Sequence, residues 1–180
     1  LADIAISQGR YARAEKLCGE ARLHVKTRRP RRGTSSSRKV QRASREEAAL
    51  LATLGNLRLR QFRYGEARVF LERSLEGGSR HVPALERSLI WNNLGVLHAQ
   101  EDRIEEAIRC YEEARKISAA LGQESMLMTT EANLSVLHAK RGDPSAADAA
   151  CRRALAHETL WGSARTRFLR LHATGVTSLL

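Results

Sequence analysis

The chain has 180 residues, of which 42% are hydrophobic and 28% charged, and its formal net charge is +11. This composition is ordinary for a globular protein, and no apolar run approaches the ~20 residues that a membrane-spanning helix needs. No basic-then-apolar signal segment opens the sequence. The cysteines, Cys18, Cys110 and Cys151, are too few and too scattered for a disulfide framework. We therefore expect a protein of the reducing cytoplasm that contacts no membrane.

Residues 1–26 are predicted to form a truncated helix pair. Leu1 falls about halfway along the first helix, Gly9 makes the turn, and Ala14, Cys18 and Ala21 line the second helix. The sequence does not begin with methionine, so we expect it to be a fragment of a longer protein.

Residues 27–39 are predicted to be a flexible insertion, because they contain Pro30, Gly33 and three consecutive serines but no large apolar residue. Six cations in this stretch supply more than half of the net charge of +11. They are Arg28, Arg29, Arg31, Arg32, Arg38 and Lys39.

Residues 40–78 are predicted to form a second helix pair, with Gly55 in its first helix and Ala67 in its second. Residues 81–122 form a third pair, which turns at residues 101–103. In that turn, Asp102 followed three residues later by Glu105 predicts a reciprocal cap for the second helix.

Residues 123–162 are predicted to form a fourth pair. Gly142, Asp143 and Pro144 are typical of a helix stop, an N-cap and a first-turn proline in succession. Residues 163–180, with Gly175 in register, are predicted to form one more first helix, which caps the fourth pair.

Small residues recur at a fixed interval along these pairs. Gly55, Gly95, Ser135 and Gly175 are each 40 residues apart. The small residues that open the second helices, Ala14, Ala67, Ala107 and Ala147, are 53, 40 and 40 apart. The period is therefore 40, with 13 extra residues between the first and second pairs. We expect small residues there because the two helices of each pair cross at that point.

Residues 89–114 carry the clearest pattern, with Trp91, Leu94, Gly95, His98, Ala107, Tyr111 and Ala114 in order. This pattern resembles the tetratricopeptide repeat (TPR), with His98 in place of the usual aromatic residue. The longer period is similar to the long-helix variants of kinesin light chains, Pins-type scaffolds and bacterial MalT-like regulators. The other repeats are degenerate, with Leu51, Glu131 and Leu171 in the place of Trp91. The resemblance implies an all-α, right-handed superhelix (a TPR solenoid) of about four and a half helix-turn-helix units.

The resemblance also implies that the first helices line a concave groove, where the partner binds. The residues that it assigns to this groove are Ala52, Asn56, Leu59, Arg60, Leu89, Asn92, Val96, Gln100, Ala132, Val136, Lys140, His172 and Val176. Amides and small apolar residues edged by positive charge suit an extended peptide or an amphipathic helix that bears acidic groups. The chaperone-tail variant of the family is not favoured, because Ala52 stands where that variant has a lysine. The alternative is that the groove is only a solvated surface, or is filled by the rest of the parent protein.

No nucleophile elbow, phosphate-binding glycine loop or HExxH motif occurs, so the sequence predicts no enzyme and no cofactor. Gly77 and Gly78 fit a helix end, and the acidic residues 101–106 fit a helix N-terminus better than a cation site. His98 and His138 lie one repeat apart, but no further ligand is in phase with them. Packing between repeats is therefore favoured over a metal site.

We therefore expect a protein-interaction scaffold or sensor module from a larger bacterial regulatory protein, binding a protein or peptide with acidic groups. The oligomeric state stays open. An alternative is association with nucleic-acid phosphates through the arginine-rich residues 28–39, although no aromatic residue in that stretch offers base stacking. A third reading is regulatory, because residues 31–35 resemble a basophilic kinase site.

Overall fold

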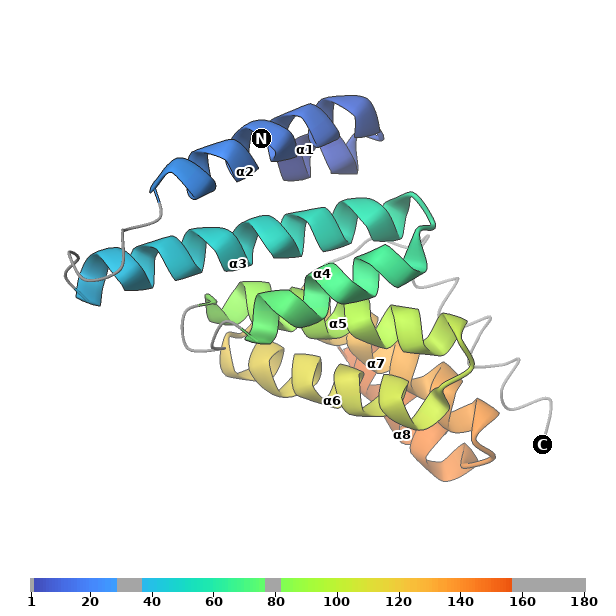
Figure 1. The fold of residues 1–180 in the computed structure, drawn as a ribbon. Helices are drawn as coiled ribbons and strands as arrows, with labels where there is room; N and C mark the ends of the chain where they lie inside the picture. The colour runs from blue at the N-terminus through green and yellow to red at the C-terminus, as the bar shows by residue number, and fades with distance from the viewer. Residues whose placement is uncertain (1, 29–36, 77–81, 157–180) are drawn as a thin grey trace. The chain divides into compact units, whose positions relative to one another are not determined.

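The computed structural model describes residues 2–28, 37–76 and 82–156, and within these ranges the chain forms eight helices and no strand (Figure 1). The helices are α1 (Ala2–Ser7), α2 (Tyr11–Arg28), α3 (Ser37–Arg60), α4 (Tyr64–Glu76), α5 (Ala84–Gln100), α6 (Ile104–Ala120), α7 (Glu124–Lys140) and α8 (Pro144–Ala156). The chain divides into two compact units, Leu1–Asn93 and Leu94–Leu180, so that the division falls within α5. We call them the N-terminal and C-terminal units.

The N-terminal unit has a small apolar core where α1, α2 and α3 meet. Ala5 and Ile6 of α1, Ala14 of α2 and Leu57 of α3 are buried together, and Tyr11 packs against them. Burial of such side chains contributes about 1.5–3 kcal/mol for each large one. This core holds the short α1 in place although a helix of its length is not stable alone.

Arg58 of α3 adds a polar link on the same unit. Its guanidinium group pairs with Glu15 of α2 and lies 3.1 Å from the carboxylate of Glu66 on α4. One side chain therefore connects three helices at this end of α3.

The C-terminal unit has a larger core, to which α6, α7 and α8 contribute. Its buried members are Ala107, Ile108, Tyr111, Leu134, Leu137 and Ala150. Val96 and Ala99, at the end of α5, and Ile104 pack against this cluster and are partly buried.

The two helices of a pair approach closely at two of the predicted crossings, Gly55 and Gly95. A Cβ added at Gly55 would lie 2.6 Å from Cγ of Leu71, and one added at Gly95 would lie 2.9 Å from Cε1 of Tyr111. The partner is 16 residues further along in both cases. The expectation of a small residue is therefore confirmed at Gly55 and Gly95, since a side chain there would push the two helices of the pair apart.

The turns inside the repeats share one backbone conformation. Gly9, Phe62, Asp102 and Gly142 have φ values of 70°, 59°, 58° and 80°, in the left-handed region that favours glycine. Each lies between the first and second helix of its repeat. This spacing repeats the intervals of 53, 40 and 40 residues found in the sequence.

The predicted cap between Asp102 and Glu105 is wrong. The N-cap residue of α6 is Arg103, and no side chain caps this helix end. Asp102 instead adopts the left-handed conformation that ends α5, whereas an N-cap residue needs an extended backbone. The prediction for the fourth repeat is confirmed, because Oδ1 of Asp143 accepts a hydrogen bond of 3.0 Å from the backbone N–H of Ala146.

The predicted loop over residues 27–39 is too long at both ends. Thr27 and Arg28 belong to α2, and Ser37, Arg38 and Lys39 belong to α3. Lysine, arginine and glutamine are good helix formers, so the helices extend to the edges of the stretch that holds Pro30 and Gly33. Residues 29–36 and the predicted capping helix 163–180 lie outside the described residues.

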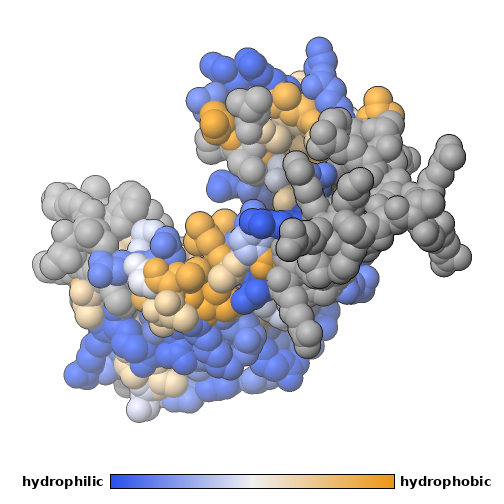
Figure 2. Space-filling model, turned by 90° about the vertical axis from the view of Figure 1, so that its left-hand side faces the viewer, coloured by the Kyte–Doolittle hydropathy of each residue, from blue (hydrophilic) through white to orange (hydrophobic). Residues whose placement is uncertain are grey.

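On the face that Figure 2 presents, the described residues are mainly hydrophilic, and hydrophobic residues gather in the middle and in the upper part of the view. Among the described residues, no helix is both long enough and apolar enough to cross a membrane.

Candidate functional site

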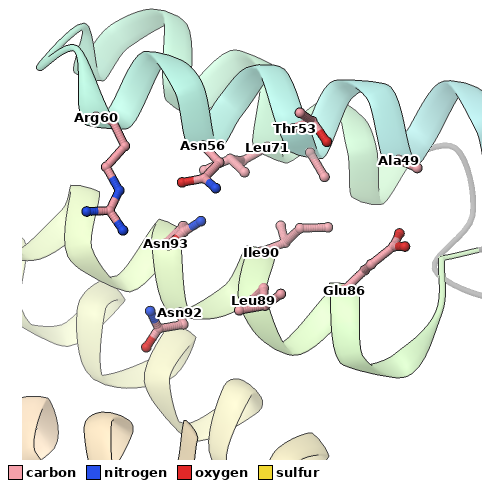
Figure 3. Close-up of a pocket in the computed structure, with 11 residues that line it drawn as sticks. Ala49, Thr53, Asn56, Arg60, Leu71, Glu86, Leu89, Ile90, Asn92 and Asn93 are labelled. Carbon is pink, nitrogen blue, oxygen red and sulfur yellow. The ribbon is translucent and has the colours of Figure 1, made fainter. Parts of the chain in front are cut away.

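The N-terminal unit contains a pocket of about 360 Å³ between α3 and α5 (Figure 3). Its lining residues are Ala49, Ala52, Thr53, Asn56, Arg60, Leu71, Glu86, Leu89, Ile90, Asn92 and Asn93. Five of the residues that the sequence assigned to a groove are thereby brought together. They are Ala52, Asn56, Arg60, Leu89 and Asn92.

One face of α3 forms one wall of the pocket. Its contributing residues, from Ala49 to Arg60, follow the three- and four-residue spacing that places side chains on a single helix face. Ala49 and Ala52 are small, so this wall is open near its beginning, and Thr53 and Asn56 place polar groups along its middle. At 1.5 Å per residue, the wall runs for about 16 Å.

One edge of α5 forms the facing wall. Glu86, Ile90 and Asn93 lie four and three residues apart, so they form a single row. Figure 3 shows Asn56 and Asn93 directed toward each other across the pocket.

The repeat pattern did not predict this row, because it assigns groove residues at the same repeat positions in every first helix. The cleft is lined instead by one edge of α3 and by the edge of α5 that faces it, and these two edges consist of different repeat positions. The polar residues Glu86 and Asn93, seven positions apart and therefore on one helix face, were the signal that could have revealed it.

The two ends of the pocket carry opposite charge. Arg60 lies at one end and Glu86 at the other, as Figure 3 shows. Oε2 of Glu86 and Oδ1 of Asn92 are buried, and neither has a hydrogen-bond partner within the described part of the chain. A buried oxygen without a donor costs free energy, so both atoms favour a ligand that brings a hydrogen-bond donor.

The remaining predicted groove residues do not line this pocket. Val96 is partly buried against the core of the C-terminal unit, and Val136 and Leu59 are partly buried as well. Gln100 is exposed, and so is Lys140, whose Nζ lies 4.0 Å from Oδ1 of Asp102. His172, with the other residues of the predicted last helix, lies outside the described residues.

The residues proposed to contact nucleic acid are only partly described. The backbone of Arg28, Arg38 and Lys39 is helical, whereas Arg29, Arg31 and Arg32 lie outside the described ranges. The nucleic-acid hypothesis therefore stays a prediction.

His98, His138 and Cys110 are buried and do not line the pocket. His98 and His138 are each 9% exposed, and Nδ1 of His138 lies 3.0 Å from a guanidinium nitrogen of Arg141. Burial, and then the charge of Arg141, lowers the pKa of His138. Burial raises the pKa of Cys110 to about 11, so its thiol is a poor nucleophile at neutral pH. Within residues 2–28, 37–76 and 82–156, no three His, Cys, Asp or Glu side chains are grouped to hold a metal ion.

Comparison with known proteins identifies the repeat. The family model described as the tetratricopeptide repeat matches residues 86–157. The crystal structure of BtubC (BKLC) from P. vanneervenii is similar to this chain, with a TM-score of 0.73 and 21% sequence identity. The match covers 99% of this chain and 69% of that one. No curated protein sequence matches the chain. The fold class predicted from the sequence, an all-α repeat solenoid, is confirmed, and residues 86–157 match the tetratricopeptide repeat family.

Proposed function

We propose that this chain is a protein-interaction module that binds a peptide segment in the pocket between α3 and α5. One observation carries the proposal: residues that the repeat pattern assigned to the partner-binding groove line a single pocket. Tetratricopeptide repeats are in general non-enzymatic modules for protein–protein interaction. The general role therefore follows from the family, and the location of the site is our proposal.

The lining of the pocket suits a peptide backbone. Asn56, Asn92 and Asn93 each offer an amide that both donates and accepts, as a peptide bond does. Ala49 and Ala52 leave space for an apolar side chain between these amides. Peptide recognition commonly combines main-chain hydrogen bonds for affinity with small pockets for specificity.

The wider setting is part of the same proposal. By analogy with MalT-like regulators, the chain serves as a scaffold or sensor module within a larger bacterial regulatory protein of the cytoplasm. We assign further contacts with the partner to the residues that occupy the positions of Asn56, Arg60 and Asn92 in the later repeats. They are Val96, Gln100, Val136, Lys140 and His172.

The test removes the amides without disturbing the core. The purified chain and a variant with Asn56→Ala and Asn92→Ala are used to select binders from a library of random 12-residue peptides. Loss of two hydrogen bonds at about 1 kcal/mol each should weaken the selected peptides roughly tenfold or more. The matched control is Gln8→Ala, which removes an exposed amide outside the pocket.

Circular dichroism establishes that the variants fold alike. Peptides that bind the double variant as tightly as the original chain would show that this pocket is not the binding site. Competition by single-stranded DNA that disappears as salt rises would instead favour the arginine-rich residues 28–39 as the contact.

A further inference from the structure

We infer that the pocket between α3 and α5 selects an extended segment with one basic and one acidic side chain, three to five residues apart. The basic side chain pairs with Glu86 and the acidic one with Arg60. This inference rests on the proposed function and adds the chemistry of the partner.

Glu86 is the reason to expect a cation. Its Oε2 is buried and has no hydrogen-bond partner within the described residues, while the carboxylate lines the pocket. The next residue, Arg87, donates to the backbone oxygen of Val82 at 3.3 Å. Glu86 lies in the first turn of α5, where the helix dipole favours a negative charge. An ammonium or guanidinium group would supply the donors that this oxygen lacks.

Arg60 is the reason to expect an anion at the other end. It is exposed, and no hydrogen bond or ion pair involves its side chain among the described residues. The nearby acidic groups are already used, because Arg58 pairs with Glu15 and Glu66, and Arg63 pairs with Glu66 as well. Arg60 therefore remains available for a carboxylate from outside.

The length of the pocket sets the spacing of the two charges. The wall of α3 from Ala49 to Arg60 runs for about 16 Å, which an extended chain covers in about five residues at 3.3 Å each. Side chains reach toward the ends, so separations of three to five residues fit. A helix would need about eleven residues for the same length.

The experiment compares peptide selections on four chains: the original, Glu86→Gln, Arg60→Gln and the control Glu72→Gln. Glu72 is an exposed carboxylate on α4 outside the pocket, so its variant has the same change of charge. The original chain and the control should enrich Lys or Arg together with Asp or Glu at a separation of three to five residues. Glu86→Gln should lose the basic preference alone, and Arg60→Gln the acidic preference alone.

A selected peptide then gives the magnitude. Its affinity should fall tenfold or more in Glu86→Gln, and replacing its basic residue by glutamine should weaken binding to the original chain but not to Glu86→Gln. The double variant Glu86→Lys with Arg60→Glu should select peptides in which the order of the charges is reversed.

Three results would overturn the inference. The first is that the original chain shows no preference for a basic residue, and the second is that this preference is unchanged in Glu86→Gln. If the selected peptides still need Asn56 and Asn92 for binding, the proposed function stands and only the inferred charge preference is wrong. If the selected peptides bind without these two amides, the proposed function and the charge preference are both wrong. The third result is self-association of the chain that Glu86→Gln abolishes, which would make a second copy the occupant.

Discussion

Gly95→Ala probes the helix crossing within the third repeat. The new Cβ would lie 2.9 Å from Cε1 and Cζ of Tyr111 and 3.0 Å from its Cδ1. Tyr111 is 3% exposed and belongs to the core of the C-terminal unit, so its ring has little room to move. The extra methyl group should therefore separate α5 from α6.

The magnitude follows from two opposing effects. Overpacking a filled core costs about 1–3 kcal/mol. Replacing glycine by alanine within a helix contributes about 1 kcal/mol of stability. Gly19 isolates the second effect, because it lies inside α2 and a Cβ there meets nothing within 4 Å. Gly19→Ala should thus stabilise by about 1 kcal/mol, and Gly95→Ala should be about 2 kcal/mol less stable than Gly19→Ala.

Urea unfolding followed by circular dichroism measures both variants, and tryptophan fluorescence in a Trp161→Phe background reports on Trp91 in the third repeat. Tyr111→Cys supplies the rescue, because Cys151 occupies the corresponding place one period later, opposite Ser135. In a double-mutant cycle, Gly95→Ala and Tyr111→Cys should couple by about 1 kcal/mol or more. If Gly95→Ala is as stable as Gly19→Ala, or the two changes are additive, the crossing is not set by this contact.

Three further outcomes are expected. Phe62→Gly should stabilise by about 0.5–1 kcal/mol in urea unfolding, because Phe62 is 77% exposed with a left-handed φ of 59°; a loss of stability would contradict this. Asp143→Ala should lower the melting temperature above pH 5 but not near pH 2. The hydrogen bond from Ala146 lowers the pKa of Asp143, so its stabilisation is full above the unfolded-state pKa and is lost as the pH falls through the folded-state pKa. Glu131→Leu should change the free energy of unfolding by less than about 1 kcal/mol, because leucine fills the same space. Glu131→Ala should lower it by about 2–3 kcal/mol, because it leaves a cavity. A large loss of stability in the leucine variant would show that the charge of Glu131 is needed.

The last expectation rests on the surroundings of Glu131. Its side chain is 3% exposed and lies 2.8 Å from Nε of Arg153 and 3.6 Å from a guanidinium nitrogen of Arg115. Both arginines are partly exposed, so each can turn to water if the carboxylate is removed. Leu51 and Trp91 fill the same position in the neighbouring repeats, which indicates that the place accepts an apolar residue.

The repeat itself was predictable because packing at a crossing tolerates few residues. Gly55 and Gly95 meet side chains 16 positions later, and this constraint is visible in the sequence as a period of 40. Gly142 and Asp143 were predictable for a related reason, since each has a conformation or a hydrogen bond that few other residues provide.

The failures share a different cause. Aspartate is a favourable N-cap residue, but the turn between α5 and α6 requires a left-handed backbone at Asp102. This conformation is incompatible with the extended backbone of an N-cap residue. Glu86 and Asn93 were missed because a cleft depends on which edges of two helices face each other, and one helix pattern does not contain that information. The ends of the basic stretch were misplaced because its arginines and lysine are compatible with helix as well as with loop.

The constant separation of the crossing partners has a consequence for how such a chain gains length. Gly55 and Leu71 are 16 residues apart, as are Gly95 and Tyr111. The thirteen extra residues fall between Cys18 and Gly55, where they divide no such pair. A duplication or splice that cuts between partners would leave a bulky residue opposite the wrong neighbour, whereas a cut between pairs carries both partners together. Positions suitable for grafting or for circular permutation of this chain therefore lie between the last residue of one crossing pair and the first residue of the next.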